Sequence, residues 1–297
     1  MQPKSQTTGS RATKTRNDPA WVRIPLILAA VGTLGLLVIV PVVHVFYQAL
    51  RPGVAVYLNN LWGDPDTRHA ISLTLTVVPI AVVMNILFGV AAAWTIARFR
   101  FPGRTLLTSL IDLPFSVSPV VAGLMLLLIF GLQGYLGPWL REHGLRVVFA
   151  TPGLILATTF VTLPFVAREL LPVMEAIGDS EELAAVSLGA NGWQMFWRIT
   201  VPNIRWGLLY GVILCNARAM GEFGAVYVVS GHIAGRTDTM PLRVEKLFQE
   251  YNNPGSFALA SVLTLLAVVT LVIKVSLQRK TRRQLAEATA WNEGVAA

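Results

Sequence analysis

Long stretches of apolar residues recur along this chain, and they limit its possible folds more than any other feature. A helix that spans a membrane needs about 20 such residues. Six stretches are long enough: 24–50, 70–97, 106–130, 147–167 with a bent continuation to 177, 207–230 and 251–273. Only 13% of the 297 residues are charged, whereas soluble proteins average about 25%. We therefore predict an all-α membrane protein with six transmembrane helices.

The third stretch is expected to be a broken helix. Its sequence from Leu113 is LPFSVSPVVAGL, and the two prolines disfavour a continuous helix at this point. Broken helices at membrane depth occur where protein or a water-filled cavity surrounds them. Ser116, Ser118 and Pro119 are therefore candidates to line a pathway, and the alternative is a kink that serves packing alone.

Basic residues are distributed unevenly between the two sides that six spans imply. Sixteen Lys and Arg residues lie in the two terminal tails, the loop 98–104 and the neighbourhood of 179–202, against seven in the opposite loops. Cytoplasmic segments carry such an excess. The prediction is a cytoplasmic basic tail at 1–23, a six-span domain at 24–276 and a second cytoplasmic tail at 277–297.

The segment 179–202, between the fourth and fifth spans, is predicted to form two short helices. Asp179 can cap the first helix, with Glu182 three residues later in the answering position of a capping box. Gly189 suits the left-handed conformation that ends a helix. These signals predict a compact helical insert on the cytoplasmic side.

The second helix of this segment has its own start and stop signals. Asn191 can cap it, with Gln194 in the answering position, and Pro202 is expected to end it because the residue before a proline avoids helical angles. The aromatic residues that share one face at helical spacing are Trp193, Phe196 and Trp197. An amphipathic insert of this kind either lies at the lipid headgroups or docks into a soluble partner.

The spacing of segment 179–202 resembles the cytoplasmic loop of ABC-importer permeases. Their pattern is Glu-Ala-Ala, three residues, Gly, nine residues, Ile, one residue and Leu-Pro. Leu183 replaces the expected Glu, which Glu182 can supply from one position earlier, and Val201 replaces Leu. The resemblance implies a coupling helix that inserts into a separate ATP-hydrolysing subunit. The implied coupling residues are Glu181, Glu182, Ala184, Ala185, Gly189, Trp193, Phe196, Trp197, Ile199 and Pro202.

Arg218 and Glu222 are the two charged residues within the fifth apolar stretch. They are four residues apart and therefore share a face of a helix. A charge at the centre of a bilayer costs about 2.5–3.5 kcal/mol on insertion scales, and pairing reduces this cost. The two residues either belong to a pathway or gate, or form a purely structural pair.

Three further stretches resemble the W-type permease subunits of bacterial sulfate/thiosulfate ABC importers. They are LPFSVSPVVAGL at 113–124, NARAMGEFGAVYVVSGHIAG at 216–235 and RTDTMPLRVEKLFQEYNNPGSFALASVLTLLA at 236–267. The RAMGEFGA run is typical of the oxyanion branch, so a molybdate or tungstate permease is the alternative. The resemblance implies a multi-pass protein of the bacterial inner membrane, surrounded by lipid. Its implied partners are an ABC ATPase dimer, a second T-type permease subunit and a periplasmic sulfate-binding protein.

No enzymatic or cofactor chemistry is predicted for this chain itself. It contains no Gly-rich loop that ends in Lys-Ser/Thr, so ATP and Mg²⁺ are expected on the partner ATPase. The single Cys215 and four scattered histidines suggest neither a disulfide nor a metal site. The net charge of +8 comes without a basic face interleaved with aromatic residues, so no nucleic-acid partner is expected.

Two functions of other classes remain as alternatives. An ion-coupled secondary transporter usually has inverted repeats and more polar residues at mid-membrane, and it gives the insert at 179–202 no purpose. A membrane scaffold without transport leaves Arg218 and Glu222 unexplained. Uptake that depends on ATP separates the importer from both.

Overall fold

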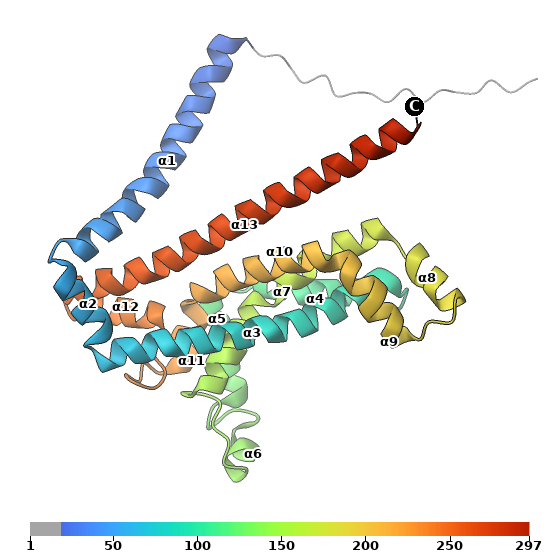
Figure 1. The fold of residues 1–297 in the computed structure, drawn as a ribbon. Helices are drawn as coiled ribbons and strands as arrows, with labels where there is room; N and C mark the ends of the chain where they lie inside the picture. Colours follow the sequence, from blue (N-terminus) through green and yellow to red (C-terminus); the bar gives the residue numbers. More distant parts are fainter. Residues whose placement is uncertain (1–18, 297) are drawn as a thin grey trace, which may run out of the picture. The chain divides into compact units, whose positions relative to one another are not determined.

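The structure, a computed structural model, describes residues 19–296, with side chains described to Leu277 apart from that of Ala20. The predicted tail 1–23 lies mostly outside the described residues, as do the basic side chains beyond Leu277. Within the described part the chain forms helices and no strand, as predicted (Figure 1). The helices are α1 Ala20–Leu50, α2 Val54–Trp62, α3 Pro65–Arg98, α4 Arg104–Ser116, α5 Pro119–Phe130, α6 Gly137–Glu142, α7 Thr151–Ile177, α8 Ser180–Ser187, α9 Gly192–Met195, the π-helical turn Phe196–Thr200, α10 Val201–Met220, α11 Gly224–Ser230, α12 Met240–Gln249 and α13 Asn253–Ala296.

The described part contains four to six candidate membrane spans, judged by length and composition. The four continuous ones are Trp21–Leu50, Pro65–Arg98, Thr151–Ile177 and Asn253–Leu277. Two more arise if each of two bent pairs crosses the membrane as one span. The α4–α5 pair is bent by 111°, and the pair formed by Gly192–Met220 and α11 is bent by 53°. The expected break in the third apolar stretch is therefore confirmed, and the fifth is broken as well.

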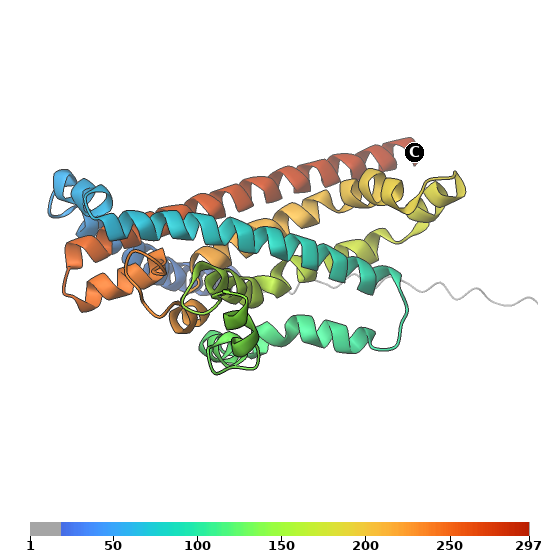
Figure 2. The same ribbon diagram turned by 90° about the horizontal axis from the view of Figure 1, so that it is seen from below.

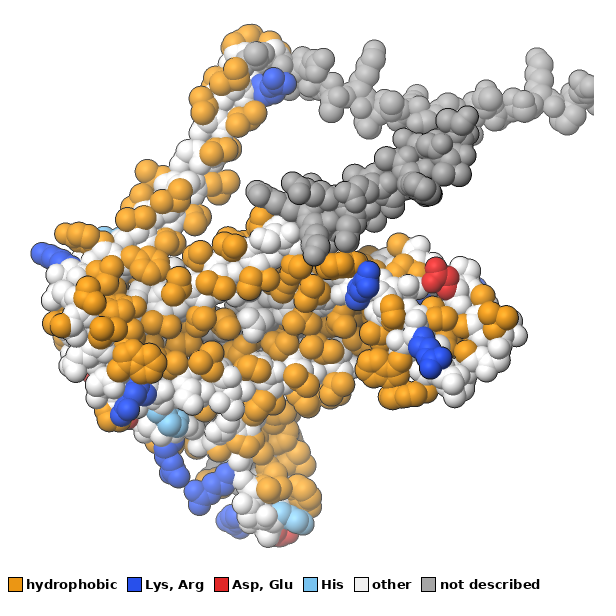
Figure 3. Space-filling view, in the orientation of Figure 1, with side chains coloured by type: hydrophobic (Ala, Val, Ile, Leu, Met, Phe, Trp, Pro, Cys, Tyr) orange, Lys and Arg blue, Asp and Glu red, His pale blue; other side chains and the backbone are white. Residues whose placement is uncertain are grey.

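The chain divides into two compact units, Met1–His44 and Val45–Ala297. The first holds most of α1, whose side chains such as Leu28 and Leu36 are exposed, as suits a helix that faces lipid. On the face of the second unit shown in Figure 3, hydrophobic side chains cover the middle and charged ones lie toward the ends and loops. This distribution fits a bilayer around the helices.

The core of the second unit forms where α3, α7 and α10 pack together (Figures 1 and 2). Val166 and Leu170 of α7 are fully buried there, next to Ile204 of α10. Asn85 of α3 is also fully buried, and its Nδ2 donates to Thr162 Oγ1 of α7 at 2.7 Å. The three helices thus form a packed frame with shorter elements at both of its ends.

Three of the connections between the expected spans contain short helices, and one of these is α6, between residues 130 and 147. The segment 51–69 includes α2, and the segment 231–250 includes α12, which buries Leu242 and Leu247. Neither helix has a membrane-length apolar run, and their positions depend on contacts with α3 and α13 rather than on local signals. The long apolar stretches of the sequence therefore do not predict these helices.

Asp64 joins α12 to the start of α3. It accepts hydrogen bonds from the backbone N–H of Asp66 at 3.2 Å and from Thr67 Oγ1 at 2.6 Å, and Arg243 Nη2 lies 2.7 Å from Asp64 Oδ2. Burial raises the pKa of the Asp64 carboxyl, but the hydrogen bonds from Thr67 and Arg243 outweigh it and hold the pKa below its ordinary value. This end of α3 is opposite to the Arg98 end, where α8 and α9 lie (Figures 1 and 2).

Candidate functional site

Glu182 makes the polar contacts that attach the segment 179–202, which is predicted to couple to the ATPase, to the rest of the protein. Its carboxylate forms a bidentate ion pair with Arg98 at the end of α3, with Nε–Oε2 and Nη2–Oε1 distances of 2.8 and 3.1 Å. Thr200 Oγ1 donates to Glu182 Oε1 at 2.8 Å, and Arg98 Nη1 donates to the Met174 carbonyl of α7 at 2.9 Å. Both charged side chains are 10% exposed. One buried ion pair therefore connects α8 to α3, α7 and the start of α10.

This arrangement corrects two expectations. Asp179 does not cap α8 through its side chain, and Glu182 points inward to Arg98 instead of back to the N-cap. A bidentate bond to a guanidinium is stronger than a neutral capping bond, so the tertiary partner replaces the local one. Glu182 is also buried, whereas its neighbour Glu181 is exposed and accepts from Asn203 Nδ2 at 2.5 Å. Of these two carboxylates, only Glu181 is open to a partner.

The turn between the two short helices follows the sequence prediction. Gly189 has a φ of +88°, in the left-handed region, and a Cβ there would meet nothing within 4 Å. Asn191 and Gln194 form the predicted capping box, with bonds of 2.8 Å from the Gln194 N–H to Asn191 Oδ1 and 3.1 Å from the Asn191 N–H to Gln194 Oε1. Both features depend on neighbouring residues alone, which is why local signals predict them.

Pro202 does not end the second helix. The chain runs from α9 through the π-helical turn Phe196–Thr200 directly into α10, with Pro202 in the first turn of α10. A proline is tolerated in a first turn because its missing N–H needs no partner there, and the wider π turn precedes it. The end of the insert is thus helically continuous with the fifth apolar stretch.

The outer side of α8 and α9 is apolar and exposed. Trp193 is 71% exposed and Trp197 52%, and their rings are in edge-to-face contact at 5.6 Å. Phe196 is half-buried between Trp197, at 5.5 Å, and Trp94 of α3, at 5.9 Å, with both ring contacts edge-to-face. We call the exposed apolar set the α8–α9 surface; it consists of Leu183, Val186, Leu188, Trp193 and Trp197. Among the other predicted coupling residues, Ala184 is exposed, Ile199 is half-buried and Ala185 is buried.

The predicted pathway residues lie at the two helix breaks. Ser116 ends α4, Ser118 precedes α5 and Pro119 is its first residue; both hydroxyl-bearing residues are exposed. Arg218 Nη1 lies 2.7 Å from Glu222 Oε2, so the predicted ion pair forms. Glu222 is not in a helix with Arg218, however, because α10 ends at Met220. Its Oε1 accepts from the backbone N–H of Ala225, which satisfies the start of α11.

The two breaks face each other. A Cβ on Gly224 would lie 2.9 Å from Pro119 Cβ, and a Cβ on Gly123 would lie 2.8 Å from the Ala225 carbonyl oxygen. Both glycines are therefore required for the close approach of α5 and α11. The structure thus brings Pro119 next to the Arg218–Glu222 break, which the sequence does not predict.

Three residues that position the site were missed by the sequence reading: Arg98, Thr200 and Trp94. Arg98 was counted only as a basic loop residue, although it is the last residue of α3. A basic residue that ends a long apolar helix has to find water, lipid phosphate or a carboxylate. Glu181 and Glu182 in the segment 179–202 were the signal in the sequence that such a carboxylate partner exists.

The sequence model of the family described as binding-protein-dependent transport system inner membrane component matches residues 85–283. The sulfate transport system permease protein CysW of Escherichia coli (strain K12) is 54% identical over 259 residues, which cover 86% of this chain and 89% of that protein. CysW of Synechocystis sp. is 51% identical, and the match covers 88% of this chain and 94% of that protein. The related CysT of Escherichia coli (strain K12) is 37% identical, over 75% of this chain and 80% of that protein.

Solved structures support the same fold. A chain of a bacterial ABC transporter involved in the import of the acidic polysaccharide alginate superposes with a TM-score of 0.68 at 19% identity, over 89% of this chain and 96% of that one. Since the family match covers most of the chain and several relatives exceed half identity over nearly their whole length, this protein belongs to the family of inner membrane components of binding-protein-dependent transport systems.

Proposed function

We propose that this chain is the permease subunit of an ATP-driven importer of sulfate and thiosulfate, and that it contributes half of the translocation pathway. The observation that carries the proposal is the α8–α9 surface, which is apolar and exposed although it lies at the end of the helices and not along them. It rests on the buried Arg98–Glu182 pair, which holds its position against the frame. The substrate follows from the relatives named as sulfate permeases.

In this proposal the α8–α9 surface docks into a groove on one subunit of the ATPase dimer. Helices that insert into grooves do so through apolar anchors three or four residues apart, and Trp193 and Trp197 have this spacing. Trp is also the residue that most often carries binding energy at interfaces. Closure of the ATPase dimer then moves α8 and α9, and the continuous turn at Phe196–Thr200 carries the movement into α10.

The proposed topology has six spans, with each bent pair crossing once and with both termini in the cytoplasm. The helices α2 and α12 lie at the end of α3 that is opposite to α8 and α9 (Figures 1 and 2). If α8 and α9 are cytoplasmic, α2 and α12 then face the periplasmic binding protein. The second, T-type permease subunit is expected to complete the pathway.

The pathway is proposed to pass the two helix breaks. Arg218 is 34% exposed on its side chain, whereas Glu222 is 1% exposed. The carboxylate is therefore enclosed and the guanidinium reaches the open side, with Ser116 and Ser118 exposed at the facing break. A positive charge beside hydroxyl groups suits the passage of a dianion without tight binding.

Uptake by a bacterial strain that lacks its own sulfate permeases tests this function. The chain, expressed with its partner subunits, should restore accumulation of radiolabelled sulfate, and unlabelled thiosulfate should compete. If molybdate competes at a lower concentration than thiosulfate does, the chain is a molybdate permease instead. Accumulation that persists after ATP depletion while an ion gradient is kept would contradict the importer function itself.

A further inference from the structure

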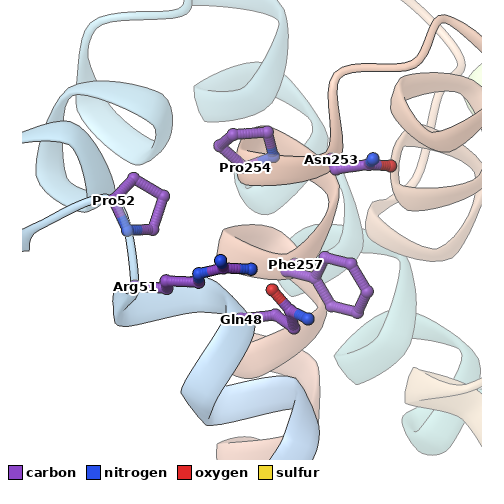
Figure 4. A pocket seen from close by; sticks show the side chains of 6 residues that line it. All are labelled: Gln48, Arg51, Pro52, Asn253, Pro254 and Phe257. Carbon is purple, nitrogen blue, oxygen red and sulfur yellow. The ribbon is translucent and has the colours of Figure 1, made fainter.

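A cavity lies between the end of α1 and the start of α13, at the end of α3 opposite to the α8–α9 surface. Its volume is about 400 Å³, and its lining consists of Gln48, Arg51, Pro52, Asn253, Pro254 and Phe257. Figure 4 shows Arg51 extending across this space toward Phe257, with the two prolines on its other side. The lining contains one positive charge and two amides but no Asp or Glu. Its chemistry therefore suits an anion with apolar groups attached.

Arg51 is available to such a ligand. Its side chain is exposed, and no ion pair or hydrogen bond of its guanidinium is found within the described part of the chain. By contrast, Arg243, at the same end of α3, is paired with Asp64. The five N–H groups of a guanidinium match the oxygens of a phosphate.

The residues that line the cavity lie at the ends of two candidate membrane spans. Arg51 directly follows the apolar stretch 24–50, and Asn253 begins the membrane span of α13. A residue at the end of a span is placed at the headgroups by the length of the span.

The neighbouring helix α2 gives a second reason for this placement. Tyr57 and Leu61 pack toward α13, with Tyr57 Oη 3.1 Å from Ser261 Oγ. Val54, Leu58 and Trp62, four residues apart on another face, are 63%, 48% and 62% exposed. A short helix with one face on the protein and an exposed apolar face ending in Trp is typical of a helix in the membrane interface. Arg51 and Pro52 come just before this helix in the sequence.

From these observations we propose that the cavity binds an anionic phospholipid, with its phosphate on Arg51 and its glycerol backbone and first methylene groups on Pro52, Pro254 and Phe257. A lipid is the occupant rather than a free anion, because the apolar half of the lining and the exposed face of α2 match acyl chains. The bound lipid bridges the segment around Arg51 and the start of α13 within the second unit. This site is separate from the coupling segment and from the helix breaks.

Native mass spectrometry of the purified importer complex, equilibrated with equal amounts of phosphatidylglycerol and phosphatidylcholine, tests the proposal. The wild type should retain phosphatidylglycerol in preference to phosphatidylcholine. Arg51→Gln should weaken this retention about tenfold, the loss expected for one charge-assisted hydrogen bond. Arg51→Lys should restore most of it. Arg68→Gln is the matched control, because Arg68 is also exposed, is at the same end of α3 and has no ion pair in the described residues.

Three results would overturn the proposal: no preference between the two lipids, equal loss in Arg51→Gln and Arg68→Gln, or unchanged retention in Arg51→Gln. The same measurement is then repeated with inorganic phosphate or sulfate at millimolar concentration as a competitor of the lipid. If either displaces the lipid, the cavity is a site for a soluble oxyanion. Lipid retention is measured without transport, so the result does not depend on the proposed substrate.

Discussion

The Arg98–Glu182 pair illustrates how a single residue sets the position of the coupling segment. Its two hydrogen bonds join α3 to α8, and Thr200 and the Met174 carbonyl satisfy the remaining groups. A buried ion pair of this kind adds little to stability compared with an apolar pair, but loss of one partner leaves an unpaired charge. Its value here is the fixed geometry of α8.

Glu182→Gln should lower the free energy of unfolding by about 3–5 kcal/mol, because the Arg98 guanidinium is left buried without its charge partner. Sulfate uptake should fall with it. Arg98→Gln combined with Glu182→Gln should recover most of the thermal stability in detergent. The matched control is Arg104→Gln: the Arg104–Glu175 pair has a similar length, 2.9 Å, but is more than 40% exposed on both sides, and its loss should cost at most about 1 kcal/mol. Equal effects of Glu182→Gln and Arg104→Gln on the melting temperature would refute the buried role.

Among the elements, the close contact of α5 and α11 defines the region where the two broken helices meet. Gly123→Ala would place a Cβ 2.8 Å from the Ala225 carbonyl oxygen and 2.9 Å from Val228 Cβ. Because backbone cannot give way cheaply, we expect a loss of about 1–3 kcal/mol in stability and reduced uptake. Gly221→Ala is the control, since a Cβ there meets nothing within 4 Å. A melting temperature of Gly123→Ala equal to that of Gly221→Ala would show that α5 and α11 do not pack this closely.

The break between α10 and α11 allows a test of gating. Arg218→Gln or Glu222→Gln alone should impair assembly or transport, because each leaves the other charge unpaired at membrane depth. The double variant should assemble normally. A gate predicts that its sulfate uptake stays impaired, or that its ATP hydrolysis no longer responds to the binding protein. Full recovery of both quantities would leave the pair a structural role only.

The elements also show which features a sequence can predict. The capping box at Asn191, the left-handed Gly189 and the break before Pro119 depend on neighbouring residues, and all three are confirmed. The capping role of Asp179 and the stop at Pro202 are wrong, because Arg98 captures Glu182 and a π turn admits the proline.

The short helices between the spans could not be predicted from the sequence. The helices α2 and α12 were missed because both are too short to be membrane spans, and because the burial that stabilises them comes from α13 and α3. The ion pair of Arg218 and Glu222 was predicted from spacing, but the break between them was not, since the same spacing fits a straight helix. Contacts between distant segments thus decide what local patterns leave open.

For the whole molecule, the proposed topology makes a direct prediction. Single cysteines in a Cys215→Ala background should react with an impermeant thiol reagent from outside when placed at 60, 141 or 236. Cysteines at 101 or 190 should react only after the membrane is opened. The native Cys215 is buried, and its replacement leaves the introduced cysteine as the thiol that is labelled. Labelling of residue 190 from outside would contradict both the six-span topology and cytoplasmic docking.

The central claim is that ATP hydrolysis on a partner drives oxyanion uptake through contacts of the α8–α9 surface. Its most direct test is uptake of radiolabelled sulfate by proteoliposomes that contain this chain, its second permease, the ATPase and the binding protein. Wild-type uptake should require ATP. Gly189→Asp, which strains the turn and adds a charge beside the surface, should abolish it while the complex still inserts. Gly144→Asp should leave it unchanged, although Gly144 also has a positive φ, +66°, and open space around it. Uptake without ATP, or equal uptake by the two variants, would contradict the claim.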